Sequence, residues 1–319
     1  MSRPNAPHRA SHPNFGDPIE GTTVGFVTRI QSGFHTVHTD QGTFTCHLRG
    51  RLKRTTFRGD ILAVGDRVHI SLQTDGTAMI EDIAPRIRSL VRLDPTPKGN
   101  YQQVLLANLD QILLVFACAN PEPHLRMLDR FLVICEKQEI PLQIVANKLD
   151  LVGKERARDL FSIYPPLGYP VIFTSAVQEV GIDKLRAALS GKISGLAGPS
   201  GVGKSSLLNV IQPALGLAVR EVSQFTTKGR HTTVVREMFP LEDGGYVTDL
   251  PGLRSLSLWD TQPEELDGYF PELRDLVAEC QFNDCTHRDE PGCAVRVAVG
   301  DGRVHPERYT SYLRLRYGE

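Results

Sequence analysis

The pattern of apolar and polar positions divides the chain into two regions with different predicted secondary structure. Residues 21–84 contain five short runs rich in Val, Ile, Thr and Phe, and turn sequences such as Asp40-Gln41-Gly42 separate these runs. Five short strands in so small a segment favour a closed barrel of the OB-fold type.

From residue 101 onward the apolar positions follow a different pattern. Residues 111–119 are almost all apolar, which is typical of a strand that is covered on both faces. Residues 124–138 then place apolar side chains at helical spacing, and strand-like and helix-like segments continue to alternate as far as residue 211. This alternation predicts a parallel α/β sheet.

Length and composition exclude several classes of protein. The 319 residues suggest two domains with small appendages. No apolar run is long enough to span a bilayer, and residues 1–20 lack the apolar segment of a secretory signal. The Pro, Asn, His and Ser content of residues 1–20 predicts a disordered tail. We therefore expect a cytoplasmic protein that does not contact a membrane.

The charge distribution bears on the partner. The net charge of −1 does not by itself indicate a polyanion, but basic residues outnumber acidic ones in the first hundred residues. The segment between the third and fourth predicted strands holds five of these basic residues: Arg49, Arg51, Lys53, Arg54 and Arg58. Such a loop is often simply solvated, whereas on a small β-barrel clustered Lys and Arg favour contact with RNA phosphates.

The strongest chemical signal is the sequence G-x-x-x-x-G-K-S at residues 198–205, between a plausible strand and a predicted helix. Glycines let the backbone curl so that its N–H groups face a phosphate chain, and the helix N-terminus adds a positive dipole end. Lys204 can reach the β- and γ-phosphates, and the hydroxyl of Ser205 can bind Mg²⁺. The predicted phosphate-binding residues are Gly198, Pro199, Ser200, Gly201, Val202, Gly203, Lys204, Ser205 and Ser206.

A second motif, Asn147-Lys148-Leu149-Asp150, follows a predicted strand and bears on the base. The carboxylate of Asp150 can accept hydrogen bonds from guanine N1–H and the 2-amino group, and adenine offers neither donor. The stem of Lys148 can lie along the base plane. Small residues follow the next strand at Thr174-Ser175-Ala176, and their backbone N–H groups can reach guanine O6. The expected nucleotides are therefore GTP and GDP.

Two further segments carry residues suited to the γ-phosphate. Asp249 follows a predicted strand and can hold a water bound to Mg²⁺, and the N–H of Gly252 can meet the γ-phosphate. In residues 228–233 a threonine is placed to bind Mg²⁺ when the γ-phosphate is present, and we prefer Thr233 to Thr232.

The order of these motifs is unusual, because the base-reading motifs precede the phosphate-binding loop. This order indicates a circular permutation, with the sheet cut after the D-x-P-G motif that begins at Asp249. The chain that leaves this motif therefore runs directly into the C-terminal segment.

The C-terminal segment contains a cluster of metal-ligand residue types. Cys280, Cys285, His287 and Cys293 lie within 14 residues, and three thiolates with one imidazole can close a tetrahedral Zn²⁺ shell. A closed shell has no open position, so the predicted zinc is structural. The chain has too few other cysteines for disulfides to explain the cluster better.

These features resemble the ribosome small-subunit-dependent GTPase A family, whose members are circularly permuted GTPases that act in late maturation of the small ribosomal subunit. The resemblance covers about residues 21–319 and rests on the motif order, GPSGVGKSS, GRHTT, the preceding barrel and C-x4-C-x-H-x5-C. It implies an OB-fold domain, a permuted GTPase domain and a mostly α zinc-binding domain, with the small subunit and its rRNA as partner. One departure is Leu250, where the family usually has Thr, and we expect its side chain to point away from the nucleotide.

The sequence therefore predicts a multi-domain GTPase that hydrolyses GTP to GDP and phosphate, with Mg²⁺ and one Zn²⁺ per chain, and we expect a monomer. The predicted division of the chain is a disordered tail at 1–20, an OB-fold RNA-binding domain at 21–85, a permuted GTPase domain at 98–257 and a zinc-binding domain at 258–319.

Hydrolysis is expected to be slow in the isolated protein and stimulated by the small subunit. Leu253 stands where many GTPases place a water-orienting Gln, and an apolar side chain cannot orient water. His231 is the candidate for the missing group. The alternative, that His231 contacts only rRNA or solvent, stays open.

The motifs disfavour two other classes of function. A P-loop small-molecule kinase would use ATP, which the N-K-x-D motif disfavours. A plain RNA-binding module with a vestigial nucleotide site would not need the intact Lys204, Ser205 and Asp249.

Overall fold

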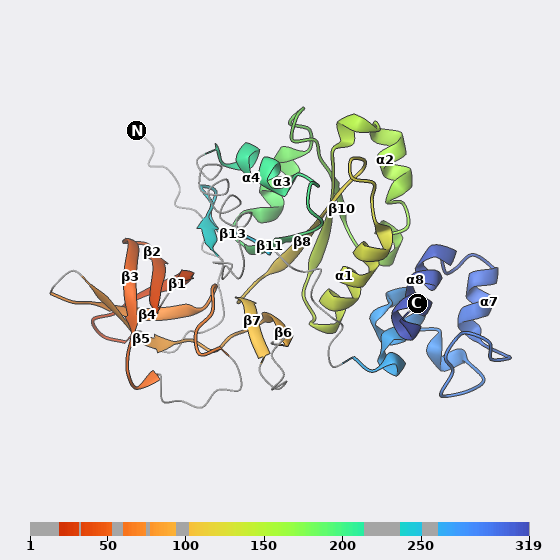
Figure 1. Ribbon diagram of the computed structural model, residues 1–319, viewed down its shortest axis with the longest axis horizontal. Coiled ribbons are helices and arrows are strands. Elements are labelled where there is room, and N and C mark those ends of the chain that lie inside the picture. Colours follow the sequence, from red (N-terminus) through yellow and green to blue (C-terminus); the bar gives the residue numbers. More distant parts are fainter. Residues whose placement is uncertain are drawn as a thin grey trace, which may run out of the picture.

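The structure is a computed structural model that describes residues 19–31, 33–52, 60–74, 77–93, 102–213, 237–250 and 261–318. Figure 1 shows three parts along the longest axis: a small barrel, a central sheet flanked by helices, and a helical C-terminal part. This arrangement confirms the predicted multi-domain fold class. Of the predicted disordered tail, only Ile19 and Glu20 belong to the described residues.

The first part is a closed five-stranded barrel with the strand order β1-β2-β3-β5-β4, as the five apolar runs predict. Its strands are β1 (Thr23–Gln31), β2 (Phe34–Thr39), β3 (Gly42–Leu48), β4 (Arg67–Leu72) and β5 (Ala78–Ile83). The strand β1 shifts register between Val27 and Arg29, and such a bulge bends a strand so that it can pair on both sides. Inward-facing side chains fill the interior: Val27, Val37, Cys46, Val68, Ile70, Ala78 and Ile80.

The second part is a six-stranded sheet with the order β10-β9-β8-β11-β13-β12. All neighbours pair in parallel except β12 and β13, so the predicted parallel α/β sheet is confirmed. The strands are β8 (Gln111–Ala117), β9 (Leu142–Asn147), β10 (Val171–Phe173), β11 (Ile193–Ala197), β12 (Met238–Pro240) and β13 (Tyr246–Asp249). The helices are α1 (Leu125–Lys137), α2 (Lys154–Leu160), α3 (Ile182–Leu189) and α4 (Lys204–Ile211), with short 3₁₀ helices at Leu149–Leu151 and Pro165–Leu167.

The central strand β8 shows how helices cover both faces of the sheet. Every residue of β8 is buried. Alternate side chains of a strand point to opposite faces, so Ile112 and Phe116 pack with α1 while Leu113 and Val115 pack with α3 and α4. The carboxyl ends of the parallel strands therefore meet at one edge of the sheet, where their loops come together.

A two-stranded hairpin of β6 (Ser89–Leu93) and β7 (Gln102–Ala107) joins the barrel to the sheet, and the sequence analysis did not predict it. The barrel approaches β7 very closely at Gly65, where a Cβ atom would lie 2.1 Å from the carbonyl oxygen of Ala107. The backbone N–H of Ala107 donates to the carbonyl of Val64 at 2.9 Å. On the other side, the hydroxyl of Tyr246 in β13 lies 2.8 Å from Nδ1 of His38 in β2. The barrel is thus held against the hairpin at Gly65 and against the central sheet at His38.

The C-terminal part consists of short helices around its own core, as predicted. Its elements are a 3₁₀ helix at Pro263–Tyr269, α6 (Pro271–Arg274), a 3₁₀ helix at Val277–Glu279, α7 (Ala294–Gly300) and α8 (Pro306–Tyr317). The core is built from Leu266, Phe270, Leu273, Val295, Ala298 and Tyr312, and Val133 of α1 joins it from the central domain. Within the described part of the chain, no helix combines the length and the apolar composition needed to cross a bilayer.

Candidate nucleotide site and metal centre

The predicted phosphate-binding loop connects β11 in the middle of the sheet to α4. Two of its glycines allow the loop to lie against the ends of neighbouring strands. A Cβ atom on Gly198 would lie 2.0 Å from the carbonyl oxygen of Val115 in β8. Gly203 has a φ of +94°, and a Cβ there would lie 2.4 Å from Nδ2 of Asn147. Larger residues at these positions would force the loop away from the base-reading segment.

The side chain of Lys204 is directed back into this loop. Its ammonium Nζ donates to the carbonyl oxygens of Gly198 at 3.0 Å and Pro199 at 3.1 Å. The charge therefore already lies within the curl that a phosphate chain would occupy. Ser205 and Ser206 are exposed in the first turn of α4, where backbone N–H groups have no partner within the helix.

Asp249, at the end of β13, pairs in register with Leu196 of the P-loop strand. Burial raises the pKa of its carboxyl group, and the nearby Lys204 cation opposes that shift. Among the described residues its buried Oδ1 has no hydrogen-bond partner. A buried, unpartnered carboxylate oxygen beside the phosphate loop fits the hard oxygen ligand that Mg²⁺ prefers.

The segment expected to read the base is held by hydrogen bonds between three loops. Asn147, at the end of β9, donates from Nδ2 to the carbonyl of Val202 at 2.9 Å, and its Oδ1 accepts from Thr174 at 3.1 Å. Asn147 therefore ties the phosphate loop to the loops after β9 and β10. No sequence pattern predicts the hydrogen bond between the side chains of Thr174 and Asn147.

Asp150 and Ser175 lie side by side in this segment. The hydroxyl of Ser175 donates to Oδ1 of Asp150 and accepts from the backbone N–H of Gln178, which fixes the carboxylate and leaves its other oxygen available. Ala176 follows Ser175 and is half-buried. The arrangement suits a carboxylate that reads two adjacent donors of a base.

The two residues between Asn147 and Asp150 take different directions. Lys148 has a φ of +62°, and its ammonium donates to the carbonyl of Asn120 in the loop after β8. Leu149, by contrast, is only 6% exposed and packs in the core, so only its backbone lies near the site.

Leu250 also turns into the interior. It is 4% exposed, and its Cδ1 lies 2.5 Å from the position that a Cβ on Gly195 would occupy. Gly195 thus provides the space for this leucine within the sheet.

Four of the residues discussed in the sequence analysis lie outside the described part of the chain: His231, Thr233, Gly252 and Leu253.

The four predicted metal ligands converge in the C-terminal part. The ligand atoms of Cys280, Cys285, His287 and Cys293 all lie within 4.8 Å of one another. Nδ1 of His287 is 3.5 Å from the sulfur of Cys280 and 3.5 Å from that of Cys293. Zinc bonds of ordinary length in a tetrahedron separate sulfur from nitrogen by about 3.5 Å, so the cluster fits a closed zinc site. Burial raises the pKa of the Cys285 thiol to about 12, so proton release is part of any metal binding here.

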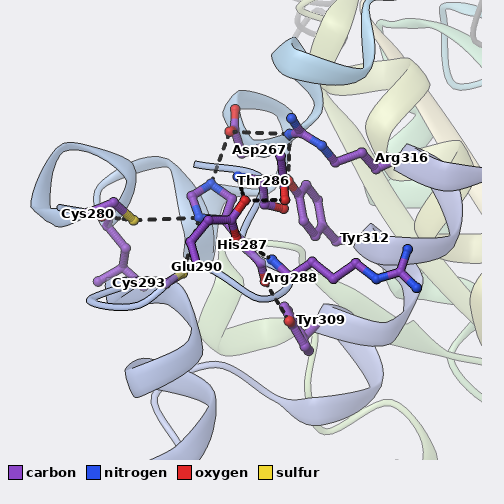
Figure 2. A network of polar contacts seen from close by, with 11 residues as sticks. Asp267, Cys280, Thr286, His287, Arg288, Glu290, Cys293, Tyr309, Tyr312 and Arg316 are labelled. Atoms are coloured by element: carbon purple, nitrogen blue, oxygen red, sulfur yellow. Dashed lines mark hydrogen bonds and ion pairs between the residues drawn. The ribbon is translucent and has the colours of Figure 1, made fainter. Parts of the chain in front are cut away.

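The other nitrogen of His287 has a partner that the sequence analysis missed. Nε2 lies 3.2 Å from a carboxylate oxygen of Asp267, and Figure 2 shows the imidazole between this carboxylate and the thiols. A carboxylate behind a ligating histidine fixes its tautomer and ring orientation. Two tyrosines of α8 hold the same loop: Tyr309 donates to the carbonyl of His287 at 2.6 Å and Tyr312 to that of Thr286 at 3.2 Å.

Fold and site together define a class of protein. The strand β9, which precedes the N-K-x-D motif, comes before the P-loop strand β11 in the chain, yet both end at the same edge of one sheet, with Asp249 beside the loop. The chain is therefore a circularly permuted P-loop GTPase, an enzyme that hydrolyses GTP. Its residues 83–259 match the model of the RsgA GTPase family, and residues 24–80 match the model of the RsgA N-terminal domain. The chain belongs to the RsgA GTPase family, which confirms the resemblance drawn from the motifs.

Similar proteins cover nearly the whole chain. The small ribosomal subunit biogenesis GTPase RsgA of Gemmatimonas aurantiaca is 47% identical over 299 residues, which are 92% of this chain and 97% of that protein. RsgA 2 of Bacteroides thetaiotaomicron is 38% identical, over 91% of this chain and 95% of that protein. The crystal structure of YjeQ from Thermotoga maritima matches with a TM-score of 0.74 and 36% identity, covering 93% of this chain and 98% of that one. The structure of YloQ, a circularly permuted GTPase, matches with a TM-score of 0.71 and 30% identity, covering 94% and 95%.

Proposed function

We propose that this GTPase acts in maturation of the small ribosomal subunit, that the subunit stimulates its GTP hydrolysis, and that the barrel and the C-terminal part bind rRNA. The observation that carries the proposal is the combination in one chain of a GTPase site with a barrel and a Cys/His module attached on either side of it (Figure 1). The names of the curated relatives support the ribosomal assignment. We also propose that the protein is a cytoplasmic monomer with domains at 21–85, 98–257 and 258–319.

At the nucleotide, Lys204 exchanges its carbonyl partners for the β- and γ-phosphates. The carboxylate of Asp150, which the hydroxyl of Ser175 orients, accepts the guanine N1–H and 2-amino donors, and this makes the site selective for guanine. Ser205 and Thr233 are the residues that would hold Mg²⁺, which neutralises phosphate charge when bound, and Asp249 would hold a water bound to that ion. His231 is the proposed water-orienting group, and Gly252 the proposed backbone donor to the γ-phosphate.

On the barrel, an exposed aromatic pair supports contact with unpaired bases. Phe34 is 51% exposed, and its ring centroid lies 5.1 Å from that of His47 on the neighbouring strand β3. Aromatic faces of OB-type barrels stack bases with little sequence preference. Arg49 stands close to this pair in sequence but forms an ion pair with Glu81, and Arg51 donates to the carbonyl of Glu81. The remaining basic residues of the predicted loop lie outside the described part of the chain.

In the C-terminal part, Cys280, Cys285, His287 and Cys293 are the proposed ligands of one structural Zn²⁺, with Asp267 orienting the histidine.

The decisive experiment is GTP turnover measured with and without purified small subunits. We expect turnover to rise when the subunits are added, and we expect His231→Ala to remove most of that rise while GTP affinity is retained. Unchanged turnover in the presence of subunits would contradict the proposed stimulation, and equal binding of ATP and GTP would contradict the nucleotide assignment.

A further inference from the structure

A groove lies beside the edge strand β10, and none of the proposed phosphate or Mg²⁺ ligands lines it. It has a volume of about 310 Å³ and an apolar floor formed by Leu149, Val180 and the strand residues Val171–Phe173. Three long cationic side chains, Lys154, Arg158 and Lys184, form its rim. Two of the cations stand on α2 and one on α3, so the rim is positive on both sides of the floor.

The strand along this groove is open on its outer side beside Val171, whereas Gly181 lies against the carbonyl of Phe173, 2.1 Å from where a Cβ on Gly181 would stand. Among the described strands β10 pairs only with β9, because it is the last strand of the sheet. The carbonyl of Pro170 accepts from Ile144 and the N–H of Thr174 donates to Ala146, so the even-numbered residues of β10 face β9. The N–H and C=O groups of Val171 therefore point into the groove, and an open strand edge of this kind is a template for a further strand.

The three rim cations are uncompensated. Within the ranges that the structure describes, Lys154, Arg158 and Lys184 make no ion pair or hydrogen bond, whereas the neighbouring Asp183 is paired with Arg186 at 3.7 Å. Lys154 and Arg158 are one helical turn apart and so lie on the same face of α2. Three unpaired positive charges around an apolar floor favour an acidic ligand.

From this geometry we infer that the groove docks an acidic, extended segment of a partner protein, which adds as a strand beside β10. One apolar side chain of the segment lies on the floor, and carboxylates on either side of it meet the rim cations. A nucleic acid phosphate chain would satisfy the cations, but it would leave the apolar floor empty and the backbone groups of Val171 without partners. The inference does not depend on the proposed ribosomal function.

The test is a selection of peptides from a random 12-residue library on the full-length protein loaded with GDP. We expect the enriched peptides to be acidic, with at least one apolar residue, and to bind more weakly as salt is added. The variant with Lys154→Glu, Arg158→Glu and Lys184→Glu should lose affinity for a synthetic copy of the best peptide by roughly tenfold or more. Arg156→Glu, on the same helix but outside the groove, is the matched control and should bind as the parent does.

Two further measurements separate strand addition from simple charge attraction. N-methylation of alternate peptide amides on the side that faces β10 should abolish binding, while methylation of the other set should not. GDP affinity and the circular dichroism spectrum of each variant should match those of the parent. The inference is overturned if no acidic peptide is enriched, if the triple variant binds as the parent does, if both methylated sets bind equally, or if a single-stranded RNA 12-mer binds the groove and no peptide does.

Discussion

The buried ion cluster between α1 and α8 offers a sharp test of how the C-terminal part is held. Arg308 of α8 is 1% exposed and donates to Asp129 of α1 at 2.7 Å and to Glu272 at 2.6 Å. Asp129 also accepts from the hydroxyls of Ser311 and Tyr164. Asp129→Ala would leave the guanidinium of Arg308 with only one carboxylate partner. It would also leave the hydroxyls of Ser311 and Tyr164 without their acceptor.

The expected magnitude follows from this burial. Removing one partner of a buried, hydrogen-bonded ion pair costs about 3–5 kcal/mol, because the remaining charge stays desolvated. The same helix supplies a matched control in Glu136, whose pair with Arg274 at 3.1 Å is half-exposed. An exposed pair contributes about 0.2–1 kcal/mol, so Glu136→Gln should have a much smaller effect.

The assay is hydrogen exchange of α8, followed by urea unfolding of each variant. Asp129→Ala should raise the exchange rate of α8 by roughly two to three and a half powers of ten, at about 1.4 kcal/mol per tenfold. Asp129→Asn, which keeps the shape of the side chain, should fall between Asp129→Ala and Glu136→Gln. If α8 is as well protected from hydrogen exchange in the Asp129→Ala variant as in the Glu136→Gln variant, the buried cluster does not hold the C-terminal part against α1.

Four further outcomes are expected. Asp150→Asn should abolish a preference for GTP over ATP of about 10⁴, measured by competition between the two nucleotides. If the variant keeps the preference, a residue other than Asp150 reads the base. Gly203→Ala should weaken GDP binding far more than Gly191→Ala does. Both glycines have a positive φ, but only a Cβ on residue 203 would collide with Asn147. Equal losses of GDP affinity in the two variants would show that backbone strain alone is responsible. Cys285→Ala should lower the zinc content from about one per chain while GDP binding is retained in part, and metal analysis that finds no change would exclude this ligand. Burial opposes ionisation of Glu290, but hydrogen bonds from Thr286 and nearby N–H groups outweigh burial and lower the pKa of Glu290 from 4.5 to about 2. The ionised form therefore stabilises the fold above pH 4.5, and the destabilisation caused by Glu290→Gln should shrink as the pH falls from 4.5 toward 2. A destabilisation that does not change with pH would refute this origin.

The sequence predicted those parts of the molecule that local patterns encode. The five barrel strands and the alternation of the central sheet each follow from periodicity within a few residues, and the phosphate loop from glycines at fixed spacing. The contact of Asp129 with Arg308 joins residues 179 positions apart, and no local pattern marks either as buried. The contact of Asp267 with His287 could not be predicted either, because no motif spacing marks a carboxylate 20 residues before the histidine. Leu149 was expected among the nucleotide residues because it stands within the motif, but its burial depends on the tertiary core.

The helix α8 contacts both the Cys/His cluster and α1. Tyr309 and Tyr312 donate to backbone carbonyls of His287 and Thr286, as Figure 2 shows. Arg308, one helical turn before Tyr312, holds α1 through its buried pair with Asp129. The loop that precedes α1 supplies the carbonyl of Asn120 to the ammonium of Lys148 in the base-reading segment. A continuous series of contacts therefore runs from the Cys/His cluster through α8 and α1 to the segment predicted to read guanine. Because α1 and α8 share a buried charge cluster, α1 can move independently of α8 only if that cluster breaks.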